Sequence, residues 1–89
     1  MGINDKLLRE WDKELHAAVE TLDLQTFKEF QKKWTDLGVY EKEVVEKATD
    51  TVIEISIRKM AMALPSITPE TKRKAKEWLT SRGYDTTIF

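Results

Sequence analysis

The chain has 89 residues, the size of one small domain, so we expect residues 1–89 to form a single unit. Its residues are 40% hydrophobic and 35% charged. This composition is too apolar for a disordered chain, and the high charge is typical of helices with solvated faces. The absence of cysteine excludes disulfide bonds, thiolate metal ligands and a cysteine nucleophile.

The sequence has neither a signal-peptide pattern nor a stretch that approaches the roughly 18 apolar residues of a membrane span. We therefore expect a cytoplasmic protein with no membrane partner. The net charge is −1, but residues 1–57 carry 8 basic and 13 acidic side chains, whereas residues 58–89 carry 7 basic and 3 acidic ones. This asymmetry is compatible with self-association, with a partner surface, or with packing of the two halves against each other.

The first predicted helix covers about residues 5–22. Asn4 precedes it as a candidate N-cap, and Ile3 and Leu8 have the spacing of a hydrophobic staple. His16, the only histidine, lies beside the apolar face, which favours a partly exposed side chain over a general base or a metal ligand. The apolar residues recur three or four positions apart, as on one face of a helix, at Leu8, Trp11, Leu15, Ala18 and Leu22.

The second predicted helix covers about residues 24–37. Asp23 is a suitable N-cap directly after the first helix, so we expect a tight turn and a helical hairpin. Gly38 is expected to end the helix, because glycine readily adopts the left-handed conformation found there. The predicted apolar face consists of Phe27, Phe30, Trp34 and Leu37.

The most apolar stretch, residues 41–64, contains neither glycine nor proline and is predicted to form one long helix. The predicted fold class is therefore all-α, a small four-helix bundle-like domain organised around this helix. A β-strand is the alternative for its centre, because Thr49–Ile57 is rich in β-branched residues that alternate in part with polar ones. The segments on both sides are good helix formers with no turn signal, which favours the helix.

The last predicted helix covers about residues 69–82. Thr68 is its expected N-cap, Pro69 stands at its first position, and Gly83 follows its end. Residues 84–89 have no helical pattern and are predicted to form an extended tail. The helix is strongly basic, with Lys72, Arg73, Lys74, Lys76 and Arg82.

The segment from Ile67 to Arg73, followed by Arg82-Gly83-Tyr84, resembles the last helix of LacI-type repressor headpieces. The helix-turn-helix that carries the base-reading residues in that family has no counterpart here, because Pro65 and the predicted long helix take its place. The resemblance therefore assigns neither a family nor DNA-contacting residues. The basic side chains by themselves leave three possibilities, which are a solvated face, a nucleic-acid contact and a protein contact.

Residues suited to catalysis or to ligand binding are sparse. Glycine occurs only at positions 2, 38 and 83, so the chain has no phosphate-binding loop. Helical Glu-x-x-His pairs, which hold metals in some bundles, are absent. The hydroxyl side chains have no base nearby in the sequence, so we predict no enzyme, no metal, no cofactor and no small-molecule substrate.

The candidate contact surfaces follow from the predicted long helix. At about 1.5 Å per residue it outruns its shorter neighbours, so residues 59–64 are expected to project, and methionine suits adaptable contacts. Together with aromatic residues at the ends of elements, the candidate protein interface is Met60, Met62, Leu64, Tyr40, Tyr84 and Phe89. A candidate acidic strip for a cation or a basic partner, or else a solvated face, consists of Glu43, Glu46, Asp50 and Glu54.

These observations predict a non-catalytic, small helical protein–protein interaction module. Adaptors, inhibitors and assembly factors of phage or bacterial origin are proteins of this class, a comparison that rests on analogy alone. We expect it to bind a protein partner or to form a homo-oligomer, with the dimer as the first expectation. The alternative is a nucleic-acid-binding accessory protein that uses the basic helix at residues 69–82.

Overall fold

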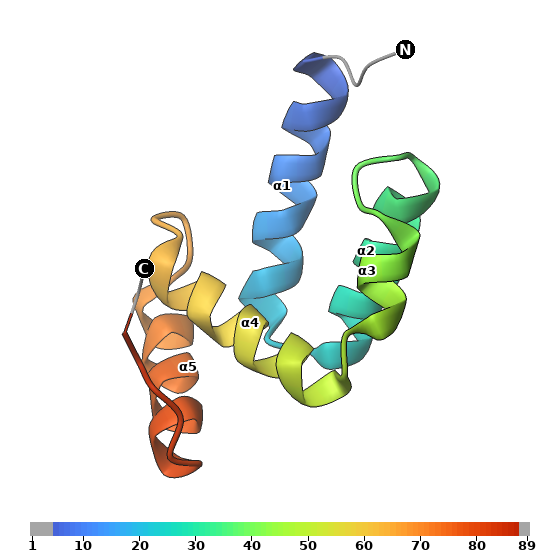
Figure 1. Cartoon of the computed structure of the whole chain (residues 1–89). Helices are drawn as coiled ribbons and strands as arrows, with labels where there is room; N and C mark the ends of the chain where they lie inside the picture. Colours follow the sequence, from blue (N-terminus) through green and yellow to red (C-terminus); the bar gives the residue numbers. More distant parts are fainter. Residues whose placement is uncertain (1–4, 88–89) are drawn as a thin grey trace.

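The structure is a computed structural model, and it describes residues 5–87. Within these residues the chain forms helices and no β-strand, which confirms the all-α prediction (Figure 1). Three helices match their predicted ranges to within one residue, whereas the predicted long helix is divided in two. The helices are α1 (Asp5–Thr21), α2 (Leu24–Asp36), α3 (Lys42–Lys47), α4 (Asp50–Ala63) and α5 (Pro69–Ser81).

The turn between α1 and α2 is as tight as the sequence predicts. Leu22 takes a left-handed conformation with φ of 53°, and its N–H donates to the carbonyl oxygen of Val19 at 3.0 Å. Asp23 is the N-cap of α2, because its carboxylate accepts from the backbone N–H of Thr26 at 2.9 Å. The two helices therefore form the predicted hairpin, with α1 and α2 packed against each other.

The single helix predicted for residues 41–64 is wrong. Ala48 and Thr49 are extended, with ψ of 128° and 158°, and this conformation interrupts the ladder of helical hydrogen bonds. The Thr49 hydroxyl accepts from the backbone N–H of Val52 at 3.2 Å and so begins a new helix. The strand alternative is also wrong, because Thr49 is followed by helix rather than by extended chain. Threonine here serves as a cap, which neither of the two sequence interpretations considered.

The core lies where the C-terminal half of α1 meets α2, α4 and the first turns of α5. Trp34 exposes only 1% of its surface, and its indole N–H donates to the Glu14 carboxylate at 3.0 Å. The short helix α3 contributes no buried residue and packs mainly against α2. The main core cluster consists of Leu15, Ala18, Val19, Phe27, Phe30, Trp34, Ile53, Ile57, Ala61, Ile67 and Ala75.

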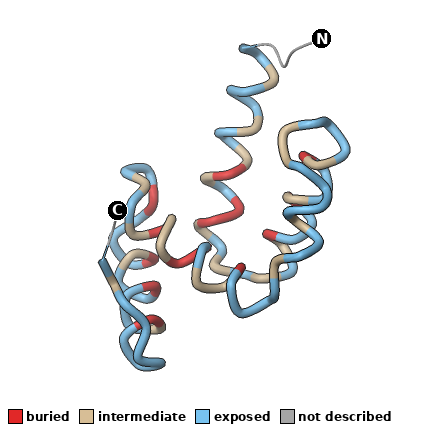
Figure 2. The backbone as a smooth tube through the Cα atoms, in the orientation of Figure 1, coloured by how far each residue is buried: buried red, intermediate tan, exposed pale blue. Residues whose placement is uncertain are grey.

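The division of residues 41–64 removes the basis for a projecting end on α4. That helix has only 14 residues, and its C-terminal part packs against α5, which leaves it at an angle (Figure 1). The helix that projects is α1, whose N-terminal half extends beyond its neighbours (Figures 1 and 2). Exposure rises along one face of α1, from 0% at Val19 and 8% at Leu15 to 41% at Leu8.

Three sequence predictions fall outside the described residues, namely the Asn4 cap, the staple between Ile3 and Leu8, and the contact by Phe89. The described part of the tail, residues 84–87, is not helical. It begins against α5, where the backbone N–H of Tyr84 donates to the carbonyl oxygen of Leu79 at 2.9 Å.

Candidate interaction surfaces

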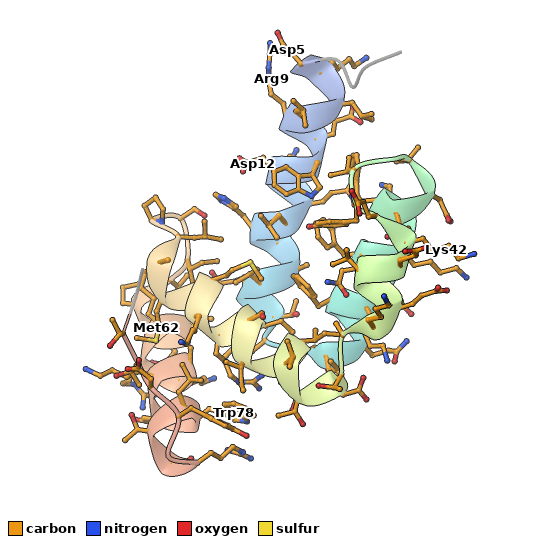
Figure 3. The ribbon with its side chains drawn as sticks, viewed as in Figure 1. Asp5, Arg9, Asp12, Lys42, Met62 and Trp78 are labelled. Atoms are coloured by element: carbon orange, nitrogen blue, oxygen red, sulfur yellow. The ribbon has the colours of Figure 1, made fainter. Side chains whose placement is uncertain are left out.

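The residues of the candidate protein interface do not form one surface. Met60, Met62 and Leu64 are half-buried and pack against the core, because α5 lies along this part of α4 (Figure 3). Tyr40 is half-buried elsewhere, where its hydroxyl accepts from the Trp11 indole N–H at 3.1 Å, and burial raises the pKa of this tyrosine.

The acidic strip is divided by the break between α3 and α4. Glu43 and Glu46 lie on α3, where both are exposed. Asp50 is the first residue of α4 and forms an ion pair with Lys28 at 3.0 Å. Glu54 lies one turn before Arg58. Burial lowers the pKa of Arg58, and attraction to the Glu54 carboxylate raises it in part. The four carboxylates therefore do not lie in the single row that a continuous helix would have made.

Of the four basic residues on α5, Lys72 makes the most hydrogen bonds to other parts of the fold. Its ammonium group donates to the carbonyl oxygens of Ala61, Met62 and Leu64 at 3.0, 3.2 and 2.6 Å. These carbonyls stand at the C-terminal end of α4, which carries the negative end of the helix dipole. The side chain of Lys72 therefore joins α5 to the end of α4.

The other basic residues of α5 are dispersed around the helix. Arg73 forms ion pairs of 2.6 Å with Glu70 and with Glu77, and these hydrogen bonds raise the pKa of Arg73. Lys74 and Lys76 point to nearly opposite sides, because residues two apart on a helix are rotated by about 200°. The described residues thus place no continuous basic stripe on α5.

A cluster of two guanidinium groups and two aromatic rings lies in the angle between α4 and α5, and we call it the Trp78 cluster (Figure 3). The Cζ atoms of Arg58 and Arg82 lie 4.0 and 4.2 Å from the centroid of the Trp78 ring, within range of cation–π attraction. Tyr84 stacks on the same ring with a centroid distance of 5.9 Å and an angle of 20°.

Arg58 was not recognised from the sequence as a residue of interest. It is 8% exposed, and its guanidinium donates to the carbonyl oxygens of Glu54 at 3.1 Å and of Leu22 at 3.4 Å. Burial lowers the pKa of Arg58, while attraction to Glu54 raises it and repulsion from Arg82 lowers it. Its position directly after Ile57, in a segment with apolar residues at Ile53, Ile55 and Met60, was the available signal.

A hollow of about 550 Å³ lies between α2, α3 and the start of α4. Its apolar lining comes from Val45, Ala48 and Ile53, and several charged side chains stand around it, including Lys42 (Figure 3). No pattern in the sequence predicted this hollow, because it forms where the break at Ala48 turns α3 away from the direction of α4.

A row of polar side chains on α1 meets the segment that joins α4 to α5. His16 Nδ1 and the Ser66 hydroxyl share a hydrogen bond, and His16 Nε2 lies 3.5 Å from an oxygen of Asp12. One turn further along, the Glu20 carboxylate accepts from the backbone N–H of Thr68 at 2.9 Å and from the hydroxyl of Thr71. These contacts tie α1 to the beginning of α5 and were not evident from the sequence.

Hydrogen bonding lowers the pKa of Glu20. The hydroxyl of Thr71 contributes most, followed by the backbone N–H of Thr68. Because Thr68 is also the N-cap of α5, the Glu20 carboxylate lies where the positive end of that helix dipole favours a negative charge.

Among residues 5–87, no group of three or more His, Asp or Glu side chains is arranged to hold a metal ion. No helix in this part of the chain is both long enough and apolar enough to cross a membrane. Comparisons with protein-family models, with curated proteins and with solved structures find no match to this chain.

Proposed function

We propose that this chain is a non-catalytic helical module that binds other proteins and associates with itself. The observation that carries the proposal is the uncovered face of α1. Leu8, Leu15 and Val19 lie on one face of the helix, and only the last two are covered by other elements. An apolar side chain that continues a core stripe beyond its cover is suited to packing against a partner.

The residue types of a serine hydrolase triad occur together at Asp12, His16 and Ser66. Their exposure and the distances between them favour a structural role. The side chain of Asp12 is 60% exposed, and its distance of 3.5 Å from His16 is long for a hydrogen bond. Ser66 is itself exposed, so water surrounds a nucleophile that hydrolysis would require to be shielded. We therefore assign this row to holding α1 against the α4–α5 connection.

Nucleic-acid binding is the less favoured alternative. It would require the positive charges of α5 to face one phosphate backbone. Lys72 instead contacts the end of α4, and Arg73 is neutralised by two glutamates. Titration with single-stranded and duplex DNA over a salt series tests this alternative, because a phosphate contact must strengthen at low salt.

Sedimentation equilibrium over a range of protein concentrations tests self-association. We expect a dimer that L8K weakens, since the new charge would be buried on association, while the fold persists because Leu8 is already exposed. The matched control is A17K, which adds the same charge at an exposed position on another face of α1. A wild-type protein that stays monomeric at high concentration would remove self-association, and equal weakening by both variants would place the contact elsewhere.

A further inference from the structure

The guanidinium groups of Arg58 and Arg82 lie against one aromatic ring, and neither forms an ion pair with any of residues 5–87. No described carboxylate lies within 4.0 Å of either group. Within the described part of the chain, the buried Nε atom of Arg58 has no hydrogen-bond partner, and the other nitrogens of Arg58 bond to neutral carbonyls. Buried cations in proteins are normally paired, because removing an unpaired charge from water is costly.

The excess positive charge extends to the surface. Arg82 is exposed, and the one described hydrogen bond of its side chain is a long one of 3.4 Å to the hydroxyl of Ser81. Lys74 lies on the same side of α5, one turn before Trp78. Glu54 offsets part of the charge of Arg58 from beyond ion-pair distance. An incoming carboxylate would therefore meet Arg82 directly and would also be attracted by Arg58 behind the ring.

The side chains around this charge have the composition of a protein-binding hot spot. Tryptophan, tyrosine and arginine are the residue types that contribute most to binding energy at protein interfaces. Tyr84 is 36% exposed and is held in place by its stacking on Trp78, so its ring is available at little cost in entropy. A partner could thus gain both an ion pair and an apolar contact at the same place.

We propose that the Trp78 cluster binds an acidic segment of a partner protein, with a carboxylate paired to Arg82 and an apolar side chain packed on Tyr84. The inference rests on the proposed role in protein binding and adds the chemistry of a partner other than a second copy. Charge complementarity favours this occupant, because Arg58, Arg82 and Lys74 lie on this side of the fold and neither arginine forms an ion pair with any described residue.

A peptide titration followed by ¹H–¹⁵N NMR tests the inference. The probe is a terminally blocked peptide of alternating glutamate and leucine, and the reference peptide has glutamine in place of glutamate. We expect the indole N–H signal of Trp78 to move with the acidic peptide only. The indole signals of Trp11 and Trp34 serve as internal references, because both donate to partners elsewhere in the fold.

The variant R82Q should weaken peptide binding about five- to tenfold, because it removes the charge that meets the carboxylate. The matched control K76Q removes the same charge from an exposed position on another side of α5 and should change binding less than about twofold. Equal effects of the two variants, or no movement of the Trp78 signal, would overturn the inference.

Two further measurements distinguish other ligands of the Trp78 cluster from an acidic segment. A response of Trp78 to inorganic phosphate or to single-stranded DNA, without a response to the acidic peptide, would overturn the inference in favour of a phosphate ligand. If R82Q abolished a dimer that the wild-type protein forms, the inference would also be overturned, because the Trp78 cluster would then bind a second copy of the chain. A monomeric wild-type protein that still binds the acidic peptide would remove self-association and leave the site at Trp78 in place.

Discussion

The contact between Lys72 and the end of α4 yields the sharpest stability prediction. The substitution K72M keeps most of the side-chain volume but removes three hydrogen bonds, of 3.0, 3.2 and 2.6 Å, to the carbonyl oxygens of Ala61, Met62 and Leu64. Hydrogen bonds from a charged donor contribute about 1.5 to 3 kcal/mol, and a partly buried cation at a helix C-terminus contributes up to about 2 kcal/mol. These terms overlap, and water replaces part of the loss, so we expect a destabilisation of about 2 kcal/mol.

Urea and thermal unfolding, followed by far-ultraviolet circular dichroism, measure this effect. A loss of about 2 kcal/mol lowers the Tm of a domain of this size by roughly 8 to 16 °C. The matched control is K74M on the same helix, where the lysine is exposed, and its effect should stay within about 0.5 kcal/mol. If K72M destabilises the protein no more than K74M does, the argument that Lys72 holds the end of α4 is refuted.

The remaining predictions concern a carboxylate, a cap and the core. The pKa of Glu20 is lowered in the folded state, so its contribution to stability is present above its ordinary pKa of 4.5 and is lost as the pH falls through the lowered value. The difference in unfolding free energy between wild type and E20Q should therefore shrink below pH 4.5, and a difference that stays constant with pH would contradict the assignment. T49A should cost about 1 kcal/mol in urea unfolding, because Thr49 caps α4, and no loss would mean that the cap is not required. W34A should cost about 3 to 5 kcal/mol, because it opens a cavity in the core and leaves Glu14 without its indole donor. A loss below about 1 kcal/mol in the same assay would place Trp34 outside the core.

The residues of the candidate surfaces could be chosen from the sequence. Which of them lie together, and which are taken up by contacts within the fold, could not. The basic residues of α5 follow directly from the sequence, yet Lys72 and Arg73 are taken up by contacts within the fold. The methionines of α4 were predicted to project because the helix was expected to be long. A cap at Thr49 shortened that helix, and the exposed large aliphatic side chains of the described residues are instead Leu8, Leu37, Val44 and Val52.

The sequence by itself determined most of the local structure, with the break at Ala48 and Thr49 as the exception. Spacing of apolar residues fixed the helical class, and Asp23 and Thr68 marked the starts of α2 and α5, because capping depends only on neighbours along the chain. The tertiary structure decided which charges meet which partners. Glu20 reaches Thr68 across 48 positions, and Arg58 reaches Leu22 across 36, and no local pattern encodes such contacts. The Trp78 cluster is of the same kind, because it exists only where α4 and α5 bring their side chains together.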